Sequence, residues 1–341
     1  MNARLEKKLR LLAVIVTASM IGGAVYSLAM GFSSAREIAV GTSYGLLISA
    51  PLASISLFLL EGPMRVWLGG LSFTANLIVR SAIYAAIIVP ILYFQLGNVI
   101  AGVARDPSHK TLWIDIAYSV ACVVLVNLVL GITNIIGPRA FLNFIIGRYH
   151  RPIEEKRFVL FVDIAGSTGL AEALGGIAIH RLLDRTFRLL TLSVIDYRGE
   201  VLDYVGDEVI VTWPERSGAI ECRPLRCFMA MRDELSRAAS QLERDFGVVP
   251  RIRGSLHFGP VIVGEIGDLK RAIVFNGDVM NTASRLEELS RNVDGGFLAS
   301  RVAMQRFNSP PPFAVRDLGR LAIRGRADGI DVVGIEAPAL A

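Results

Sequence analysis

A carboxylate at the end of an apolar segment, followed by a small polar turn, is typical of a site for a cation-bound phosphate. Asp163 lies near the end of the apolar run 157–164. The turn after this run leads into a predicted helix and contains Ala165, Gly166, Ser167 and Thr168. Backbone amides at the start of a helix bind anions, and carboxylate oxygens are ligands that divalent cations such as Mg²⁺ prefer. These residues therefore indicate a site for a metal-bound phosphate.

A second carboxylate lies at a tight turn. Asp207 follows Gly206 between two apolar segments, residues 200–205 and 208–213, and this pattern predicts a β-hairpin. Two carboxylates on neighbouring strand ends can hold two cations about 4 Å apart, a spacing that stabilises the attacking and leaving oxygens of a displacement at phosphorus. Turns favour Asp in any case. Each aspartate alone is therefore weak evidence, and the pair is what indicates this chemistry.

Asn281 and Arg285 are four residues apart on a predicted helix, so they face the same side of it. An arginine in such a place neutralises charge that develops on a phosphoryl group in the transition state. The alternative is a solvated helix face on which Arg285 pairs with Glu288. Arg251 and Arg253 alternate on another predicted strand, and we expect them to be solvated.

The second half of the chain alternates short apolar runs with segments of helical spacing. Predicted helices cover residues 180–197, 218–246 and 281–290. Predicted strands cover residues 157–164, 200–205, 208–213, 251–258, 261–265 and 271–275. Their order begins β-α-β-β-α-β, which is the order of a ferredoxin-like α+β domain.

The first half of the chain has the composition of a membrane domain. Four stretches without charged residues each exceed the roughly 20 residues that cross a bilayer core. They are residues 11–35, 38–60, 81–104 and 116–138. None of them carries a charge at its centre, and ion or proton pathways through a membrane usually need one. This absence disfavours a transporter with a regulatory tail and favours an anchoring or sensing domain.

The distribution of basic residues predicts the orientation of these spans. Lysine and arginine are concentrated before the first span, between the second and third, and after the fourth, which places both termini and the second half in the cytoplasm. Residues 1–150 carry a net charge of +6 and the remainder −1. The basic excess therefore belongs to the apolar half, and we expect the lipid bilayer, and no nucleic acid, as its partner.

Taken together, three segments of the second half resemble the catalytic domain of class III adenylate and guanylate cyclases. They read FVDIAGSTGLAEALGG, YVGDEVIVTW and RGSLHFGPVIVGEIGDLKRAIVFNGDVMNTASRLEEL, in this order. The whole chain is similar to bacterial members with a membrane region ahead of that domain, which implies a bacterial inner-membrane protein. The predicted division is a membrane domain at 1–137, a juxtamembrane coupling segment at 138–156 and a class III cyclase catalytic domain at 157–337.

The resemblance implies a role for each matching position. Asp163 and Asp207 match the metal-binding aspartates, and Ile164 matches the position whose backbone carbonyl contacts a metal. Gly166, Ser167 and Thr168, together with Ala165, match the phosphate-binding turn. Asn281 matches the ribose-positioning residue and Arg285 the residue that stabilises the transition state. Arg324 or Arg326 falls where the family often has a phosphate-binding lysine.

In this family two divalent cations, Mg²⁺ or Mn²⁺, bind a nucleoside triphosphate. The ribose 3′-hydroxyl attacks the α-phosphorus, pyrophosphate leaves, and the site is shared across a head-to-tail homodimer. The resemblance therefore implies that Asp163 and Asp207 come from one subunit while Asn281 and Arg285 come from the other.

Two positions depart from the adenylate cyclase pattern. Asp203 replaces a lysine, and Val274 replaces Asp or Thr. A carboxylate accepts hydrogen bonds from guanine, whereas adenine N1 requires a donor. ATP remains the first prediction, with guanylate or dual specificity as an alternative and a catalytically silent nucleotide-binding sensor as another. A diguanylate cyclase is disfavoured, because Val205 precedes Gly206-Asp207-Glu208 where that family has a second glycine.

Overall fold

The structure, a computed structural model, describes most of the chain and divides it into two compact units. The described residues are 3–29, 31, 33–60, 64, 67–68, 70–104, 112–137, 143, 145–269, 271–293, 295–323 and 328–336. The units are Met1–Ile136 and Gly137–Ala341, and each is described by itself. Arg324 and Arg326 lie outside the described residues, as does most of the predicted coupling segment before Ile145.

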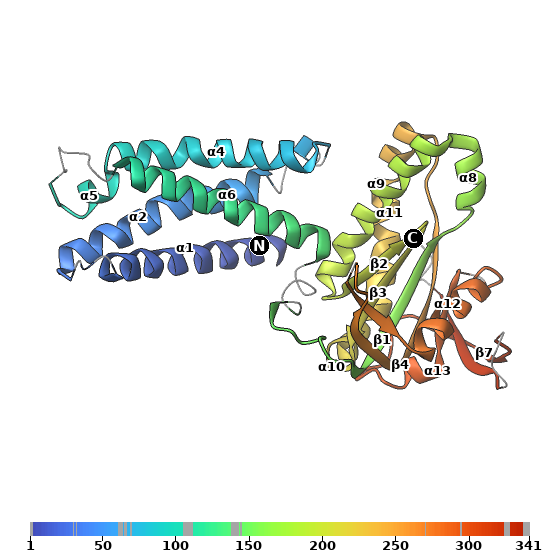
Figure 1. Ribbon diagram of the computed structural model, residues 1–341. Coiled ribbons are helices and arrows are strands. Elements are labelled where there is room, and N and C mark those ends of the chain that lie inside the picture. The colour runs from blue at the N-terminus through green and yellow to red at the C-terminus, as the bar shows by residue number, and fades with distance from the viewer. Residues whose placement is uncertain are drawn as a thin grey trace. The chain divides into compact units, whose positions relative to one another are not determined.

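The N-terminal unit is helical (Figure 1). Its elements are α1 (Ala3–Ala29), α2 (Ala35–Ser54), the π-helix η1 (Ile55–Leu60), α4 (Phe73–Tyr93), α5 (Leu96–Ile100) and α6 (Leu112–Ile136). In the described residues, three helical segments are long and apolar enough to cross a membrane: Lys8–Ala29, Ala35–Leu60 and Phe73–Tyr93. The predicted fourth span falls on α6, whose apolar helical stretch in the described residues is shorter, at Ser119–Thr133.

Two predicted span boundaries are wrong, because the helices begin at capping serines and not where the charge-free stretches begin. The first stretch was expected to continue to residue 35, but α1 ends at Ala29, and Ser34 caps α2 by accepting a hydrogen bond from the backbone N–H of Glu37. The third span was expected at 81–104, but Ser72 caps α4, which begins at Phe73. Serine at the start of a helix satisfies a backbone donor that has no partner within the helix.

Small residues bring α1 and α2 into close contact. A Cβ atom built on Gly41 would lie 2.3 Å from the carbonyl oxygen of Gly23, and one built on Gly45 would lie 2.3 Å from that of Ser19. Glycines four residues apart therefore let the two backbones approach, as they do in small-residue packing between membrane helices.

The C-terminal unit contains an eight-stranded sheet in the part of the chain that the structure describes. Its elements are β1 (Ile153–Ile164), α8 (Ser167–Leu174), α9 (Gly176–Asp196), β2 (Glu200–Val205), β3 (Glu208–Pro214), α10 (Glu215–Gly218), η2 (Ile220–Cys222), α11 (Arg223–Phe246), β4 (Ile252–Ile266), β5 (Ala272–Asn276), α12 (Asp278–Ser290), β6 (Phe297–Ser300), α13 (Arg301–Met304), β7 (Ala314–Leu321) and β8 (Ile330–Glu336). The order is β2-β3-β1-β4-β6-β8-β7, with β5 paired to β4. The first four strands are antiparallel with the connections β-α-β-β-α-β, which confirms the predicted ferredoxin-like α+β arrangement.

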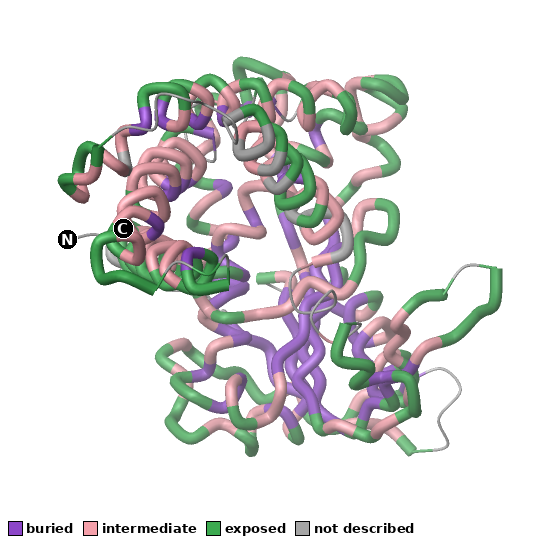
Figure 2. The backbone as a smooth tube through the Cα atoms, turned by 60° about the vertical axis from the view of Figure 1, so that its left-hand side comes forward, coloured by how far each residue is buried: buried purple, intermediate pink, exposed green. Residues whose placement is uncertain are grey.

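Helices cover both faces of this sheet, and alternate side chains of β1 pack on opposite faces. Phe158, Leu160 and Val162 pack with α9 and α11 in one apolar cluster. Val159 and Phe161 pack on the other face with residues of α12. Successive side chains of a strand point to opposite faces. Figure 2 shows the buried residues running along the strands between the helical layers.

Three predicted element boundaries are corrected. The strands expected at 251–258 and 261–265 form one continuous strand, β4. At Gly259-Pro260 only β1 pairs with β4, so the missing N–H of Pro260 interrupts no hydrogen bonds to β5 or β6. The helix expected at 218–246 is interrupted, because Glu221 and Cys222 adopt positive φ. β1 begins at Ile153, within the segment expected to be a linker.

Candidate active site

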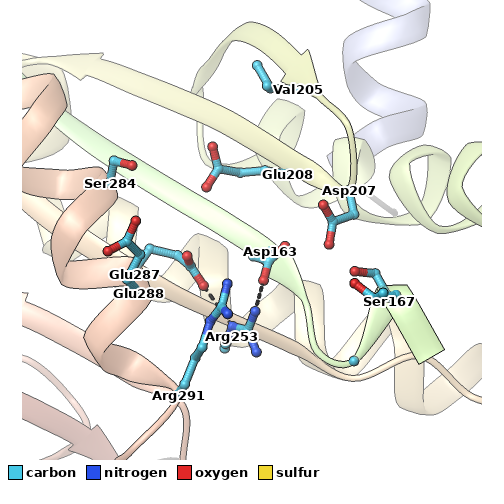
Figure 3. A pocket seen from close by; sticks show the side chains of 12 residues that line it. Asp163, Ser167, Val205, Asp207, Glu208, Arg253, Ser284, Glu287, Glu288 and Arg291 are labelled. Carbon is cyan, nitrogen blue, oxygen red and sulfur yellow. Dashed lines mark hydrogen bonds and ion pairs between the residues drawn. The ribbon is translucent and has the colours of Figure 1, made fainter. Parts of the chain in front are cut away.

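Three charged residues lie side by side near one end of the neighbouring strands β3, β1 and β4. In the strand register, Asp163 on β1 lies opposite Glu208 on β3 and, on its other side, opposite Arg253 on β4. The Asp163 side chain is 7% exposed, and the Arg253 guanidinium forms an ion pair with it (Figure 3). The Arg253 Nε also donates to Glu287 Oε1 on α12 at 2.7 Å. The face of the sheet that α12 covers therefore contains a charged row among apolar side chains.

Asp207 lies next to Asp163 because of the β2–β3 hairpin. Gly206, at the turn, has φ of +65°, a conformation that favours glycine. The backbone N–H of Ile164 donates to the carbonyl oxygen of Asp207 at 3.3 Å, which joins the hairpin to the end of β1. The structure thus brings together the two aspartates that the sequence predicted as a pair, with Ile164 beside them.

The predicted phosphate-binding turn lies at the same end of β1. Gly166 has φ of +74° and precedes the first residue of α8, and the Ala165 N–H donates to the carbonyl oxygen of Arg251 at 2.8 Å. Gly166, Ser167 and Thr168 line a pocket of about 440 Å³ together with Asp163 and Asp207. Figure 3 shows the Ser167 side chain close to Asp207.

This pocket contains more carboxylates than guanidinium groups. Its charged lining residues are Asp163, Asp207, Glu208, Glu287, Glu288, Arg253 and Arg291. Burial and the neighbouring carboxylates raise the pKa of Asp163 to about 7 and the pKa of Glu208 to about 8. Burial also opposes the charge on Asp207, but hydrogen bonds from the Asp163 carboxyl and from Ser167 outweigh it and hold its pKa below the usual range. A divalent cation at these carboxylates would balance their charge and lower the raised pKa values of Asp163 and Glu208.

These donors fit magnesium or manganese. Mg²⁺ is usually bound by one or two carboxylates plus water and substrate phosphates, rather than by a complete set of protein ligands. Among the described residues there is no cluster of three or more His, Cys, Asp or Glu side chains arranged to hold a metal. Asp163 and Asp207, with an excess of negative charge around them, match a site in which one or two carboxylates share Mg²⁺ with water and substrate phosphates.

The role of Arg253 in this site was not predicted from the sequence. We expected a solvated side chain, but it is 15% exposed and is held by Asp163 and Glu287. That expectation was wrong because strand alternation does not reveal that α12 packs over this part of the sheet. The acidic partner, Glu287, lies 34 residues away in the sequence and is itself 5% exposed.

Asn281 and Arg285 do not join this pocket within one chain. Both lie on α12, where Asn281 is exposed and Arg285 is partly buried, and neither lines the pocket that contains Asp163 and Asp207. The alternative pairing of Arg285 with Glu288 is absent among the described residues. Asp203 is exposed on β2, where its carboxylate accepts from the N–H of Tyr204 at 2.8 Å, and Val274 is partly buried on β5.

Comparison with known proteins identifies the family to which this fold and site belong. Residues 152–333 match the model of the adenylate and guanylate cyclase catalytic domain. The chain is 31% identical over 310 residues to adenylate cyclase 2 of Rhizobium meliloti (strain 1021), covering 88% of this chain and 84% of that protein. This chain therefore belongs to the adenylate and guanylate cyclase family, as its motifs predicted.

Two further similarities are more distant. An adenylate cyclase of Anabaena cylindrica is 24% identical over 210 residues, covering 60% of this chain and 41% of that protein. The structure of a bacterial light-regulated adenylyl cyclase is similar with a TM-score of 0.56 at 21% identity, covering 67% of this chain and 66% of the other. This structural likeness supports the fold alone.

Proposed function

We propose that this chain is a membrane-anchored adenylate cyclase that converts ATP to 3′,5′-cyclic AMP and pyrophosphate. The observation that carries the proposal is the meeting of Asp163, Asp207 and the turn 166–168 at one pocket. Family membership supports the reaction class, and the similarity to adenylate cyclase 2 of Rhizobium meliloti extends over most of this chain.

In the proposed reaction, a bond forms between the ribose 3′-oxygen and the α-phosphorus. The bond from that phosphorus to the leaving pyrophosphate breaks, and the 3′-hydroxyl proton passes to solvent. Two divalent cations held by Asp163 and Asp207, with the Ile164 carbonyl, would lower the pKa of the hydroxyl and stabilise charge on phosphorus. The backbone amides at the start of α8 would bind phosphate oxygens.

A homodimer is part of the proposal because one chain contains an incomplete site. Asn281 is exposed and Arg285 is partly buried on α12, and both lie outside the pocket that contains the aspartates. In a head-to-tail dimer, Asn281 of a second subunit would position the ribose, and its Arg285 would stabilise charge on the transferred phosphoryl group.

Base choice separates the main alternatives. Asp203 and Val274 depart from the adenylate pattern, and a carboxylate at 203 favours guanine donors. A guanylate or dual-specificity cyclase is therefore the second candidate, and a silent nucleotide-binding sensor is the third. Arg324 and Arg326 remain candidate phosphate-binding residues from the sequence alone.

The membrane assignment is likewise a proposal. Three apolar helices in the described residues have the length to cross a bilayer, and α6 is the proposed fourth span. The distribution of lysine and arginine favours cytoplasmic termini and a cytoplasmic catalytic domain at the bacterial inner membrane. Residues 138–156 would then connect the last span to β1.

Co-expression of two inactive variants tests the reaction and the shared site together. Asp207→Asn removes a metal ligand, and Arg285→Ala removes the proposed transition-state residue. In random dimers, half of the molecules pair one variant with the other and keep one intact site, so about a quarter of wild-type activity should return. The assay uses membranes with ATP or GTP in separate reactions, each with Mg²⁺ or Mn²⁺.

Each variant expressed alone is the control and should be inactive. Full activity of Asp207→Asn alone would contradict its proposed role as a metal ligand. If the mixture recovered no activity, the proposed site shared between two subunits would be wrong. A wild-type protein that binds nucleotide without releasing pyrophosphate would favour the silent sensor.

A further inference from the structure

Two arginines provide the basic side chains of the pocket that contains Asp163 and Asp207. Among its twelve lining residues, Arg253 on β4 and Arg291 at the end of α12 are the basic ones. Figure 3 shows the Arg291 side chain extending from α12 toward Arg253. No sequence motif predicted a role for Arg291.

The two guanidinium groups differ in the donors that they keep available. Arg253 uses Nε for Glu287 and one terminal nitrogen for Asp163. Arg291 is exposed, and it makes no hydrogen bond or ion pair with any residue that the structure describes. Its helix neighbours Glu287 and Glu288 also line the pocket, but neither forms an ion pair with it. Arg291 therefore offers the pocket five N–H donors that no described group accepts.

We propose that Arg291 binds the terminal phosphates of the nucleoside triphosphate, the part that leaves as pyrophosphate. This inference rests on the proposed function, because it assigns a further residue to the same site. If the α-phosphate lies at the two aspartates, the terminal phosphates require positive charge elsewhere in the pocket. An arginine fork matches phosphate oxygens with two parallel hydrogen bonds. Arg253 keeps its Nε on Glu287, so Arg291 has more donors to give.

This assignment gives Arg291 a different task from Arg285. Arg285 is proposed to act on the phosphoryl group in the transition state, from a second subunit. Arg291 would act on the tail of the substrate bound to its own chain, both before reaction and after pyrophosphate forms. Its loss should therefore weaken binding of substrate and of pyrophosphate, with a smaller effect on kcat.

The test compares Arg291→Gln and Arg291→Lys with Arg237→Gln in the full-length protein. Arg237 is a matched control, because it lies on α11 outside the pocket and pairs with Glu234 at 3.2 Å. Calorimetry measures binding of inorganic tripolyphosphate at saturating Mn²⁺, and the cyclase assay measures KM, kcat and inhibition by pyrophosphate. Loss of a charge-assisted pair predicts tripolyphosphate binding about tenfold weaker for Arg291→Gln, with a smaller loss for Arg291→Lys.

The midpoint of Mn²⁺ activation should stay unchanged in Arg291→Gln, which separates phosphate binding from metal binding. Wild-type affinity for tripolyphosphate in Arg291→Gln, in a protein of wild-type thermal stability, would overturn the inference. An equal loss in Arg237→Gln would also overturn it, because it would show a general charge effect. A wild type that binds tripolyphosphate through Arg291 but makes no cyclic nucleotide would contradict the proposed function and leave the inference standing.

Discussion

Asp163 and Arg253 lie directly opposite each other in the β1–β4 ladder, and their side chains form an ion pair on the face covered by α12. On its other side, Asp163 lies opposite Glu208 of β3. Like charges opposite each other on neighbouring strands are destabilising. Arg253 offsets this repulsion from one side only, and the pKa values of Asp163 and Glu208 are raised as a result of burial and of the remaining carboxylates.

Removal of the Arg253 guanidinium should destabilise the catalytic unit. In Arg253→Met, the carboxylates of Asp163 and Glu287 stay largely buried without their shared cation, which predicts a loss of about 3 kcal/mol in the free energy of unfolding. Denaturant titration of the metal-free protein measures it. Adding Glu287→Gln should recover part of the loss. A double variant that loses the full sum of the two single effects would contradict the shared ion pair.

The raised pKa values predict that the metal-free protein becomes less stable as the pH rises. The folded pKa values of about 7 for Asp163 and about 8 for Glu208 lie above their ordinary values of 3.8 and 4.5. At a pH between the ordinary and the folded pKa of each group, the folded state keeps a proton that the unfolded state has lost. The free energy of unfolding therefore falls with rising pH and levels off above about pH 8. Thermal unfolding in EDTA from pH 5 to 9 measures this slope.

Cation binding should oppose the loss of stability at rising pH, because the carboxylates must be deprotonated to bind a cation. With saturating Mg²⁺, the unfolding temperature should rise relative to EDTA, and the difference should grow up to about pH 8. Glu208→Gln should flatten the upper part of the EDTA curve. A curve in EDTA that is flat or that rises across this range would contradict the protonation of Asp163 and Glu208.

Local patterns predicted more of this molecule than long-range packing did. The hairpin 200–205/208–213 was predicted to within one residue, because Gly206-Asp207 specifies the turn locally. The meeting of Asp163 with Asp207 followed from the expected strand order. The ion pair of Arg253 with Glu287 depends on how α12 packs on β4, which no short window of sequence contains. The break before α11 depends on positive φ at Glu221 and Cys222, which neither residue type signals.

Asp203 should influence the choice of base. It lies on β2 two residues before Val205, which lines the pocket, so both side chains point to the same face of the sheet. Asp203→Lys supplies a donor for adenine N1 and removes an acceptor for guanine. The ratio of kcat/KM for ATP to that for GTP should rise by about tenfold. Asp184→Lys, on the exposed side of α9, is the control for added charge. An unchanged ratio would show that the base is selected elsewhere.

Close packing of α1 on α2 should depend on Gly41. A Cβ atom there would lie 2.2 Å from the Ser27 hydroxyl and 2.3 Å from the Gly23 carbonyl oxygen, so Gly41→Val must separate the helices. We expect a loss of about 1–3 kcal/mol, read as a lower unfolding temperature in detergent. Gly22→Val is the matched control, since a Cβ at Gly22 meets nothing within 4 Å. Equal effects of the two substitutions would indicate a cost of valine itself rather than of packing.

Tyr149 holds the segment before β1 against the C-terminal unit. This residue is 3% exposed and packs with Val159 and Phe161 of β1 and with Val279 of α12, the helix that carries Arg285. Its carbonyl oxygen accepts from the N–H of Glu265 at 3.0 Å, so both backbone and ring are held.

If residues 1–136 set the position of α12 through this contact, Tyr149→Ala in the full-length protein should shift activity in the same direction as deletion of residues 1–135. It should also lower stability by about 3 kcal/mol, because a large buried side chain is lost. Tyr149→Phe keeps the ring and loses only a 3.4 Å hydrogen bond to Glu155, so it should behave as wild type. Cyclase activity at several protein concentrations measures the effect. If Tyr149→Ala and the deletion changed neither activity nor its concentration dependence, residues 1–136 would not regulate the catalytic domain and would serve as the proposed anchor alone.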